Sequence, residues 1–357
     1  MPAALSSRRH AVGDLADAIE FCHAQGWTDG LPVVPVSDPL LERFLTQTSR
    51  DRREVIGRME HLGRECTVEL AAINAAMAGC RPDYFPVVLA VWDALMRERS
   101  ASGGGWQSTS GPAPIIVVNG PVRRELGFNS TGGVFGPGFR ANATVARAIG
   151  LIVRNAFGIV PHVLEQATQG IPGRWSICIG ENEEESPWEP LSVDGGVPAG
   201  TSAVSATLIR TSEFVDNRHT QDPEQVLWDV ANTIARPGAL IFQDTSAGVV
   251  LCPEHAQLLG DAGYSKAEVV AWLVEHCGVR QSDLRRAGKD GVDGRVRHPG
   301  GTTGDEFVRV LPSPAHVVVV VAGARNAAIS MVVRTFGVWS GAAMPVETTP
   351  RPVAQGG

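Results

Sequence analysis

Several patterns that would point to a function are missing from this chain. Lysine occurs only at Lys266 and Lys289, no polybasic stretch is present, and the net charge is −7. The sequence therefore offers no electrostatic surface for nucleic acid or for an anionic membrane. No apolar run approaches the roughly 18 residues of a membrane span, and the first ten residues lack the apolar core of a signal peptide. We expect a cytoplasmic protein without nucleic-acid or membrane partners.

Strong cofactor motifs are missing as well. The 6 cysteines are scattered without a C-x-x-C pair, so neither a disulfide framework nor a zinc ribbon is indicated. No H-x-x-x-H, Walker loop or G-x-G-x-x-G is present, which disfavours zinc and nucleotides. The cofactor stays unknown, with none or a divalent metal as the alternatives.

What is present is a globular composition of 357 residues, 43% hydrophobic and 19% charged. Strand, loop and helix patterns alternate in both halves, which predicts an α/β fold of two similar-sized lobes, with mainly buried strands and Gly-rich loops at strand ends. We divide the chain into an N-terminal helix and edge segment (1–60), a first lobe (61–205) and a second lobe (206–357), or alternatively one continuous domain. The similar order of elements in the two halves is compatible with an ancient duplication.

The local patterns predict particular elements. Helices are expected after the caps Asp14, Thr67, Asp222 and Ser265, and from about Asn142 to Phe157. Strands are expected at an edge near 31–36, from Trp175 to Ile179, and over 114–119, 203–209, 240–242, 249–251 and 316–322; exposed or mobile connections are expected over 50–64 and 285–305.

The stretch 173–190 joins a strand pattern to the densest carboxylate cluster of the chain, which contains Glu181, Glu183, Glu184, Glu185 and Glu189. Glu181 and Asn182 lie nearest the strand end, where sites in α/β sheets gather, so we assign them proton transfer or ligand binding. Glu181 and Glu184 could bind a hard divalent cation. Alternatively, Glu183 to Glu185 neutralise the row Arg140, Arg147 and Arg154 as structural ion pairs.

Two cysteines and one histidine are candidates for catalysis. Cys80 adjoins Arg81 near a helix start, which favours a thiolate, and Cys178 lies beside the carboxylate cluster. His255, at the start of a helix, is the most plausible imidazole for acid–base work. The alternatives are that both thiols are small buried hydrophobes and that His255 is a surface residue.

A glycine-rich loop from 132 to 138 precedes Arg140 and could present backbone N–H groups to a substrate carboxylate. The residues assigned to substrate binding are Asn119, Asn129, Gly133, Gly136, Arg140, Asn142, Asn182 and Trp188. For Asn119 the alternative is turn formation with Gly120, and for Trp188 it is loop packing.

Several long motifs carry a resemblance: 26–32 (GWTDGLP), 72–86 (AINAAMAGCRPDYFP), 118–121 (VNGP), 140–144 (RANAT), 168–170 (TQG) and 181–190 (ENEEESPWEP). They resemble a bacterial family whose members are often encoded beside, or fused to, a small protein with a Sec/Cys-Gly-Ser-Cys motif, the UGSC family. The resemblance covers most of the chain from Trp27 to about Glu347. It implies redox or carbon–heteroatom chemistry with a small thiol or selenol protein as partner. The chain departs from the family pattern at 323–326, where a Gly-Gly-Pro turn is expected.

Together these observations lead to the hypothesis of a small-molecule enzyme that uses thiol and carboxylate groups on a carboxylate-bearing substrate, an oxidoreductase or lyase. The alternatives are a metal-dependent hydrolase or lyase, and a non-catalytic subunit that presents a substrate to its partner. The Ala-rich helix and the 8 tryptophans favour a homo-oligomer.

Overall fold

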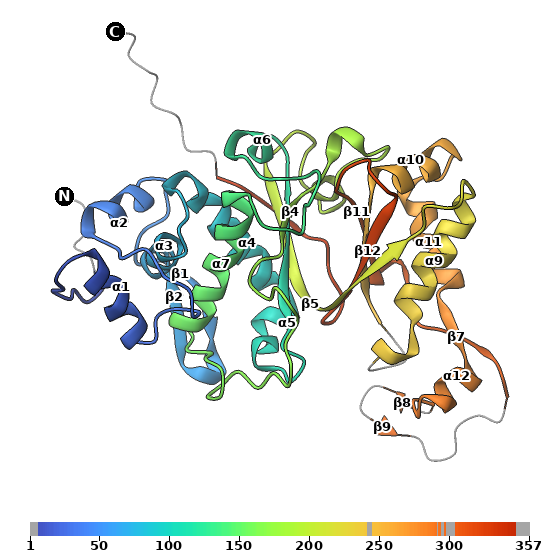
Figure 1. Ribbon diagram of the computed structural model, residues 1–357, viewed down its shortest axis with the longest axis horizontal. Coiled ribbons are helices and arrows are strands. Elements are labelled where there is room, and N and C mark those ends of the chain that lie inside the picture. Colours follow the sequence, from blue (N-terminus) through green and yellow to red (C-terminus); the bar gives the residue numbers. More distant parts are fainter. Residues whose placement is uncertain (1–5, 241–244, 291, 294–295, 298–303, 348–357) are drawn as a thin grey trace, which may run out of the picture.

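The computed structural model describes residues 6–240, 245–290, 292–293, 296–297 and 304–347. Its centre is a mixed sheet with the strand order β11-β6-β12-β5-β3-β4, and β13 pairs with β5 outside that path (Figure 1). In chain order these strands are β3 (Ala113–Asn119), β4 (Cys178–Gly180), β5 (Ala203–Asp216), β6 (Ala247–Leu251), β11 (Val317–Val321), β12 (Ile329–Thr335) and β13 (Ala343–Pro345). The predicted α/β class is confirmed.

The sheet contains two sets of three strands with the same connection order. In the first set β3 pairs parallel with β4 and antiparallel with β5. In the second set β6 pairs parallel with β11 and antiparallel with β12, and the sets join where β5 and β12 pair antiparallel. This repetition supports the duplication hypothesis. Strand β5 belongs to both pairings and begins near the expected 205/206 boundary, while the division into lobes stays a prediction.

The sheet is curled, so that the ends of its two edge strands meet. The backbone N–H of Asn182, just after β4, donates to the carbonyl of Val321 in β11 at 2.7 Å. The N–H of Gly323 donates to the carbonyl of Ser130 at 2.9 Å. A separate apolar core fills the inside of the curl, and its members include Ile115, Val117, Ile179, Val250, Val320, Val333 and Trp339.

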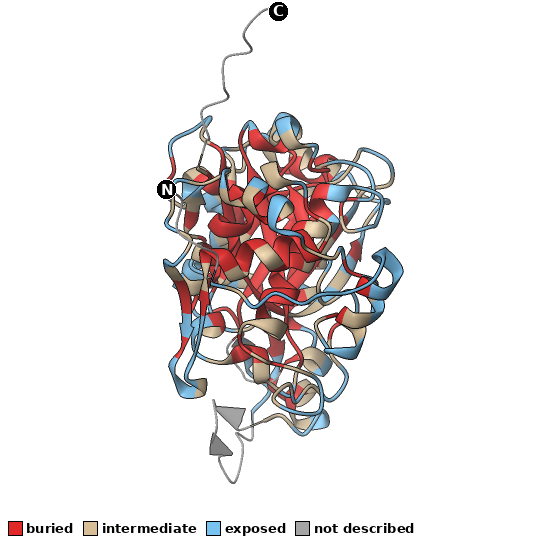
Figure 2. Ribbon diagram, turned by 90° about the vertical axis from the view of Figure 1, so that its left-hand side faces the viewer, coloured by how far each residue is buried: buried red, intermediate tan, exposed pale blue. Residues whose placement is uncertain are grey.

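Helices cover the outside of the curl (Figure 1). Helices α3 (Val68–Met77), α4 (Phe85–Arg97) and α7 (Arg140–Asn155) pack on the first set of strands, and α9 (Pro223–Ala235), α10 (Pro253–Asp261) and α11 (Lys266–His276) on the second. Side chains alternate along β3, with Ile116 and Val118 in the helix-covered core and Ile115 and Val117 inside the curl. Figure 2 shows the buried residues concentrated in this centre of the molecule.

The expected helix starts are present. Asp14 and Ser265 form complete capping boxes for α1 (Leu15–Ala24) and α11, and Thr67 and Asp222 cap α3 and α9. Helix α7 begins at Arg140, two residues before the predicted start.

Two predictions for the N-terminal part are wrong. Residues 27–36 form no strand, because Pro32 and Pro35 lack N–H donors and only the N–H of Val34 bonds across, to the carbonyl of Met77. The segment 50–64 is not merely an exposed connection. It contains β1 (Val55–Met59), which pairs antiparallel with β2 (Arg64–Thr67) and buries Met59.

The strand predicted from Trp175 is shorter than expected, since β4 covers only Cys178–Gly180. A turn closed by the Ser176 N–H on the Gly173 carbonyl at 2.9 Å occupies the preceding residues. Trp175 instead stacks on Trp106, with ring centroids 5.7 Å apart.

The remaining elements are short, apart from α2 (Asp38–Leu45). They are α5 (Arg99–Ser102), α6 (Val122–Leu126), α8 (Leu191–Asp194), α12 (Gln281–Arg286), the pair β7 (Gly278–Arg280) and β10 (Phe307–Arg309), and the pair β8 (Val292–Asp293) and β9 (Val296–Arg297). Residues 241–242 of the predicted strand, and 291, 294–295 and 298–303 of the predicted loop, lie outside the described residues. Among the helices of the described ranges, none is long and apolar enough to cross a membrane.

Candidate functional site

The ends of β3 and β4 bring together Asn119, which was predicted to bind substrate, and Glu181, which was predicted to transfer a proton. Asn119 Nδ2 donates to Glu181 Oε2 at 2.7 Å, and the backbone N–H of Leu191 donates to the same oxygen at 2.8 Å. Both side chains are 0% exposed. Glu181 Oε1 and Asn119 Oδ1 have no partner among the described residues. The pair is therefore a buried polar site in which one oxygen of each side chain could still accept a hydrogen bond.

The environment of Glu181 favours the neutral carboxylic acid. Burial raises the pKa of Glu181, although the charge of Lys266 and the hydrogen bonds from Asn119 and Leu191 act in the opposite direction. A protonated carboxyl has an O–H donor on one oxygen and can accept on the other, which matches the occupied Oε2. Such a group can exchange a proton with a ligand or water that reaches it.

An arginine that the sequence reading missed neutralises the carboxylate cluster. Arg123, on the short helix α6 after β3, is 2% exposed. Its NH2 lies 2.8 Å from Glu183 and 3.0 Å from Glu184, and its NH1 donates to the Glu181 carbonyl at 2.6 Å. These contacts lower the pKa of Glu184. The ion-pair interpretation holds for Glu183 and Glu184 with Arg123 and for Glu185 with Arg325 at 2.7 Å, but not with the predicted arginine row.

That row fastens the N-terminal part to α7 instead. Arg147 binds Asp29 through both Nε and NH2, at 2.9 and 2.8 Å. Arg140 Nε donates to the Gly79 carbonyl at 3.0 Å, and Arg154 Nε to the Gly26 carbonyl at 2.9 Å. The only signal for these pairings was that the row shares one helical face.

The glycine-rich loop does not converge on Glu181. Gly133 and Gly136 are exposed, and the N–H of Gly136 closes a turn on the Gly133 carbonyl at 2.7 Å. Arg140 is also exposed and, within the described residues, makes no hydrogen bond or ion pair with Glu181. The predicted anion site at Gly133, Gly136 and Arg140 therefore stays separate from the predicted acid.

Four of the residues assigned to substrate binding use their polar groups in hydrogen bonds within the protein: Asn129, Asn142, Asn182 and Trp188. Asn142 accepts from the Asn129 N–H at 2.8 Å and donates to the Cys178 carbonyl at 2.8 Å. Asn182 Nδ2 donates to the Gly323 carbonyl at 3.0 Å, and Trp188 Nε1 donates to the Tyr264 carbonyl at 2.8 Å. These contacts explain the local structure without a substrate, which counts against the predicted binding roles.

The two candidate thiols are buried side by side. Burial raises the pKa of Cys80 to about 12, even though Thr144, Arg140 and Arg147 act to lower it. Burial also raises the pKa of Cys178, and the neighbouring Cys80 raises it further. Burial therefore disfavours the thiolate form of both cysteines, which counts against nucleophilic roles for them.

His255 is a buried member of a hydrogen-bond chain and not a surface residue. Its Nε2 lies 2.9 Å from the Asn217 carbonyl, which can only accept, so Nε2 carries the proton. Its Nδ1 lies 2.7 Å from Ser330 Oγ, and that oxygen accepts from the Cys252 N–H at 3.0 Å. At 1% exposure the imidazole orients α10 against β12 and does not face solvent.

The predicted metal pair does not form a donor set. Glu181 is bound to amide donors and Glu184 to Arg123. Within the described ranges, no group of three or more His, Cys, Asp and Glu side chains could hold a metal ion.

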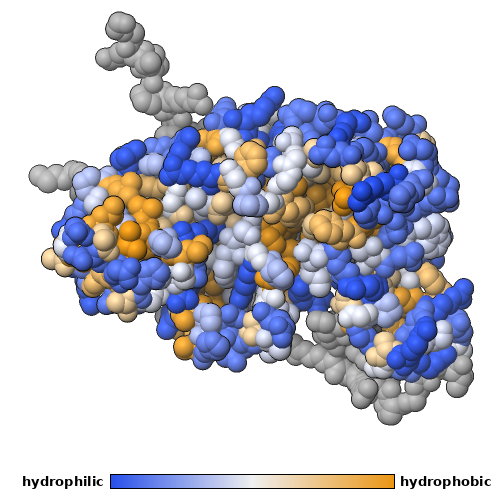
Figure 3. Space-filling model, viewed as in Figure 1, coloured by the Kyte–Doolittle hydropathy of each residue, from blue (hydrophilic) through white to orange (hydrophobic). Residues whose placement is uncertain are grey.

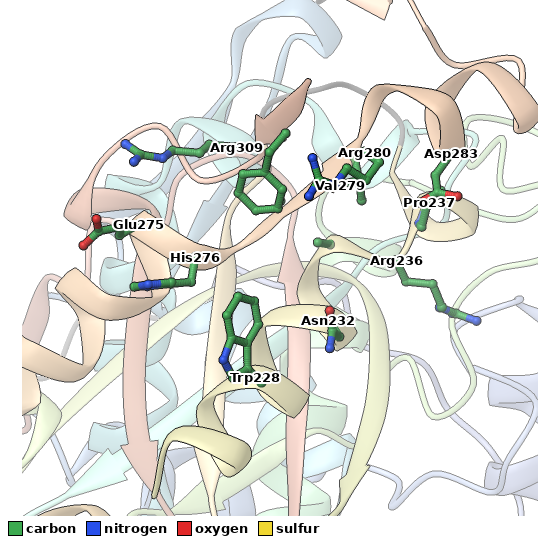
Figure 4. Close-up of a pocket in the computed structure, with 13 residues that line it drawn as sticks. Trp228, Asn232, Arg236, Pro237, Glu275, His276, Val279, Arg280, Asp283 and Arg309 are labelled. Atoms are coloured by element: carbon green, nitrogen blue, oxygen red, sulfur yellow. The ribbon is translucent and has the colours of Figure 1, made fainter. Parts of the chain in front are cut away.

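A cavity of 650 Å³ lies elsewhere, between α9, α11, α12 and the β7–β10 pair, and we call it the Trp228 pocket (Figure 4). Trp228 is 42% exposed and meets His276 edge-on at 5.4 Å, and His276 stacks on Trp272 at 4.2 Å. Figure 4 shows the rings of Trp228 and His276 next to each other, with the Arg236 side chain pointing away from them. None of the residues that the sequence assigned to a site lines this pocket.

The charges around the Trp228 pocket are unevenly compensated. Arg236 pairs with Glu213 at 2.6 Å, and Asp283 pairs with Arg286. The side chain of Arg309 makes no hydrogen bond or ion pair with any described residue, and the residue is exposed. His276 donates from Nδ1 to the Trp272 carbonyl at 2.9 Å, so in the neutral ring Nε2 is an acceptor. Aromatic surface, the cation of Arg309, the carboxylate of Glu275 and a ring nitrogen therefore line one cavity, and neither of these two charged groups has an ion-pair partner among the described residues.

No family model, curated protein or solved structure matches this chain, so the resemblance to the UGSC-associated family stays a prediction.

Proposed function

We propose that this chain binds a small molecule with a planar apolar part and a carboxylate in the Trp228 pocket. The observation that carries the proposal is the exposed indole of Trp228, held by His276 in a 650 Å³ cavity that Arg309 also lines. A cavity of this size falls within the range of pockets for small ligands, about 300–1,000 Å³. A ring stacked on Trp228 would cover apolar surface, and the carboxylate would neutralise Arg309.

This proposal fits the alternative in which the chain binds a substrate and presents it to a partner. The candidate thiols are buried with raised pKa values, and no predicted catalytic residue lines the pocket. A small thiol or selenol protein would then supply the reactive group. Cytoplasmic location and a homo-oligomeric state are part of the same proposal, and native mass spectrometry measures the oligomeric state.

Titration of the full chain with 1-naphthoate, followed by calorimetry, tests the proposal. We expect Trp228→Ala to weaken binding by at least about tenfold, because a central aromatic anchor is lost. Arg309→Ala should weaken binding of 1-naphthoate about three- to tenfold and leave binding of the neutral 1-naphthalenemethanol unchanged. Phe214→Ala is the matched control, since Phe214 is 71% exposed and does not line the pocket. Equal affinities of all variants for 1-naphthoate would contradict the proposal.

A second candidate function is proton transfer at Glu181 in an oxidoreductase or lyase. It is favoured by the unpartnered Oε1 of a fully buried carboxyl with a raised pKa at the meeting of two strand ends. The measurement is substrate turnover in the presence of the partner protein. Glu181→Gln should abolish turnover without changing 1-naphthoate binding, which separates this function from the first.

A further inference from the structure

We propose a second ligand site, for an aliphatic carboxylic acid, in a cavity of 610 Å³ beneath the N-terminal segment 6–12. The cavity lies between this segment and helices α1, α2 and α3, and it shares no lining residue with the Trp228 pocket. Figure 3 shows hydrophobic side chains gathered on the surface between the positions of α1 and α2. We call it the N-terminal cavity.

Apolar side chains from α1, α2 and α3 form one part of the wall of the N-terminal cavity. Helix α1 supplies Ala18 and Phe21, α2 supplies Leu41, and α3 supplies Ile73 and Met77. At one side the rings of His10, Phe21 and Trp27 form a cluster with centroid distances of 5.1, 5.4 and 5.7 Å. An unbranched hydrocarbon chain is flexible enough to follow walls of this mixed shape and would cover their apolar surface.

The two amide side chains that line the interior of the cavity, Asn74 and Asn155, already have hydrogen-bond partners within the protein. Asn155 Nδ2 donates to Asn74 Oδ1 at 2.7 Å and to the Trp27 carbonyl at 3.0 Å, and Asn74 Nδ2 donates to the Leu70 carbonyl at 2.8 Å. Because these amides already have hydrogen-bond partners, a ligand in the interior needs no polar group to pair with them. The interior therefore fits the tail of the ligand and not its head group.

The basic residues of the segment 6–12 lie where the polar head group of the ligand would bind. Arg9 pairs with Asp38 at 2.8 Å, which compensates the acidic residue that lines the cavity. Arg8 also lines the cavity, is exposed, and makes no hydrogen bond or ion pair with any described residue. A free guanidinium beside an apolar cavity is complementary to a carboxylate, which it can bind with two parallel hydrogen bonds.

The start of the segment that carries Arg8 is anchored by Glu69. Glu69 is 0% exposed and accepts from the N–H groups of Ser6 and Ser7 at 3.0 and 2.8 Å and from their hydroxyls at 3.0 and 2.5 Å. This anchor places Arg8 and Arg9 directly after it in the chain, and it holds the segment over the cavity.

The probe for this site is decanoate, titrated into the full chain and followed by calorimetry, with decanol as the neutral counterpart. We expect decanoate to bind the wild type about three- to tenfold more tightly than decanol, and Arg8→Ala to remove that preference. Ala18→Phe places a ring in the cavity and should weaken both probes at least about tenfold. Ala16→Phe is its matched control, because Ala16 is exposed on the same helix and does not line the cavity.

Hydrogen exchange of the wild type keeps the inference testable if Ala18→Phe fails to fold. Decanoate should slow exchange in residues 6–41 and 69–77 and leave α9 and α11 unchanged. Absence of decanoate binding, equal binding of decanoate by wild type and Ala18→Phe, or protection confined to the Trp228 pocket would each overturn the proposal.

Discussion

Asn119 donates to Glu181 at 2.7 Å across 62 residues of sequence, and the two side chains are fully buried where β3 and β4 end. The amide satisfies one carboxyl oxygen, while the other carboxyl oxygen and the amide oxygen lack partners among the described residues. An ionised carboxylate in this position would remain poorly compensated, because Arg123 binds the backbone carbonyl of Glu181 and not its side chain. Burial therefore raises the pKa of Glu181, against the opposing effects of the Lys266 charge and of the hydrogen bonds from Asn119 and Leu191.

Stability should fall as the pH rises through the pKa of Glu181. Burial raises that pKa in the folded chain, whereas the unfolded value is about 4.3, so above about pH 4.3 the folded state holds a proton that the unfolded state has lost. The free energy of unfolding then decreases by up to about 1.4 kcal/mol per pH unit until Glu181 ionises in the folded state. Urea unfolding of wild type and Glu181→Gln at several pH values measures this, and the glutamine variant should lack the decrease. Glu20→Gln, at an exposed residue, is the control.

Replacing Glu181 by alanine should be far more damaging than replacing it by glutamine. Glu181→Ala leaves the Leu191 N–H without its acceptor, removes one of the two acceptors of the Asn119 amide and opens a cavity, which we expect to cost about 2–4 kcal/mol. Glu181→Gln keeps the size and an acceptor oxygen, so we expect a change below about 1 kcal/mol near pH 5. Equal losses for the two variants would show that the carboxyl and not the acceptor is required.

Arg123 and Arg124 are neighbours with opposite environments, which makes them a matched pair for mutation. Arg123→Ala should destabilise the fold by about 3–5 kcal/mol, because it removes the partner of Glu183 and Glu184 and the donor to the Glu181 carbonyl. Arg124 has a 76% exposed side chain and lies 3.7 Å from Glu184, so Arg124→Ala should change stability by less than about 0.5 kcal/mol. Urea unfolding measures both, and similar values for the two variants would contradict the buried-cluster account.

The sequence predicted those features that depend on residues close together in the chain, such as helix caps and buried strands. Asp14 and Ser265 identified the starts of α1 and α11, because an N-cap side chain bonds to a backbone N–H only two or three residues further along the chain. The apolar runs over 114–119 and 316–322 identified β3 and β11, since strands buried on both faces read as continuous hydrophobic segments. Asn119 and Glu181 were each singled out because they follow predicted strands.

Contacts between residues far apart in the sequence could not be predicted in the same way. Arg123 lies 60 residues or more from Glu183 and Glu184, and nothing in the sequence distinguishes it from the exposed Arg124. Asp29 lies 118 residues from its partner Arg147. The Trp228 pocket was missed because its walls come from α9, α11 and β10, which are separated in the chain and carry no motif. The hint of this pocket in the sequence was Trp228 on α9, followed by Arg236 just after the helix.

The thiols offer a direct test of the chemistry predicted from sequence. All 6 cysteines are buried and unpaired, and burial raises the pKa of Cys66 and Cys277, as well as Cys80, to about 12. Alkylation by iodoacetamide at pH 8 should therefore be at least about a hundredfold slower in the folded than in the unfolded chain, because reaction requires local opening. Mass spectrometry of the alkylated peptides measures the rate at each cysteine. Rapid reaction of Cys80 or Cys178 alone would restore the thiol mechanism.

The anchor between Glu69 and the N-terminal segment should depend on pH with the sign opposite to that of Glu181. Burial by itself raises the pKa of Glu69, but the hydrogen bonds from Ser7 and Ser6 outweigh it and hold the pKa below its usual value. The stabilisation is therefore fully present above the unfolded pKa of about 4.3 and is lost as the pH falls through the lower folded pKa.

Glu69→Ala should reproduce the acid effect at neutral pH. Without the acceptor, the N–H groups of Ser6 and Ser7 should lose their protection against hydrogen exchange, by about tenfold or more, while α7 keeps its protection. Glu65→Ala is the control, because Glu65 is exposed, lies four residues away and pairs only with Arg58 at 3.5 Å. If the segment stays protected in Glu69→Ala, contacts within the N-terminal cavity hold it in place and Glu69 does not. Decanoate binding by that variant would then be unchanged, whereas a segment released by the substitution should bind decanoate more weakly.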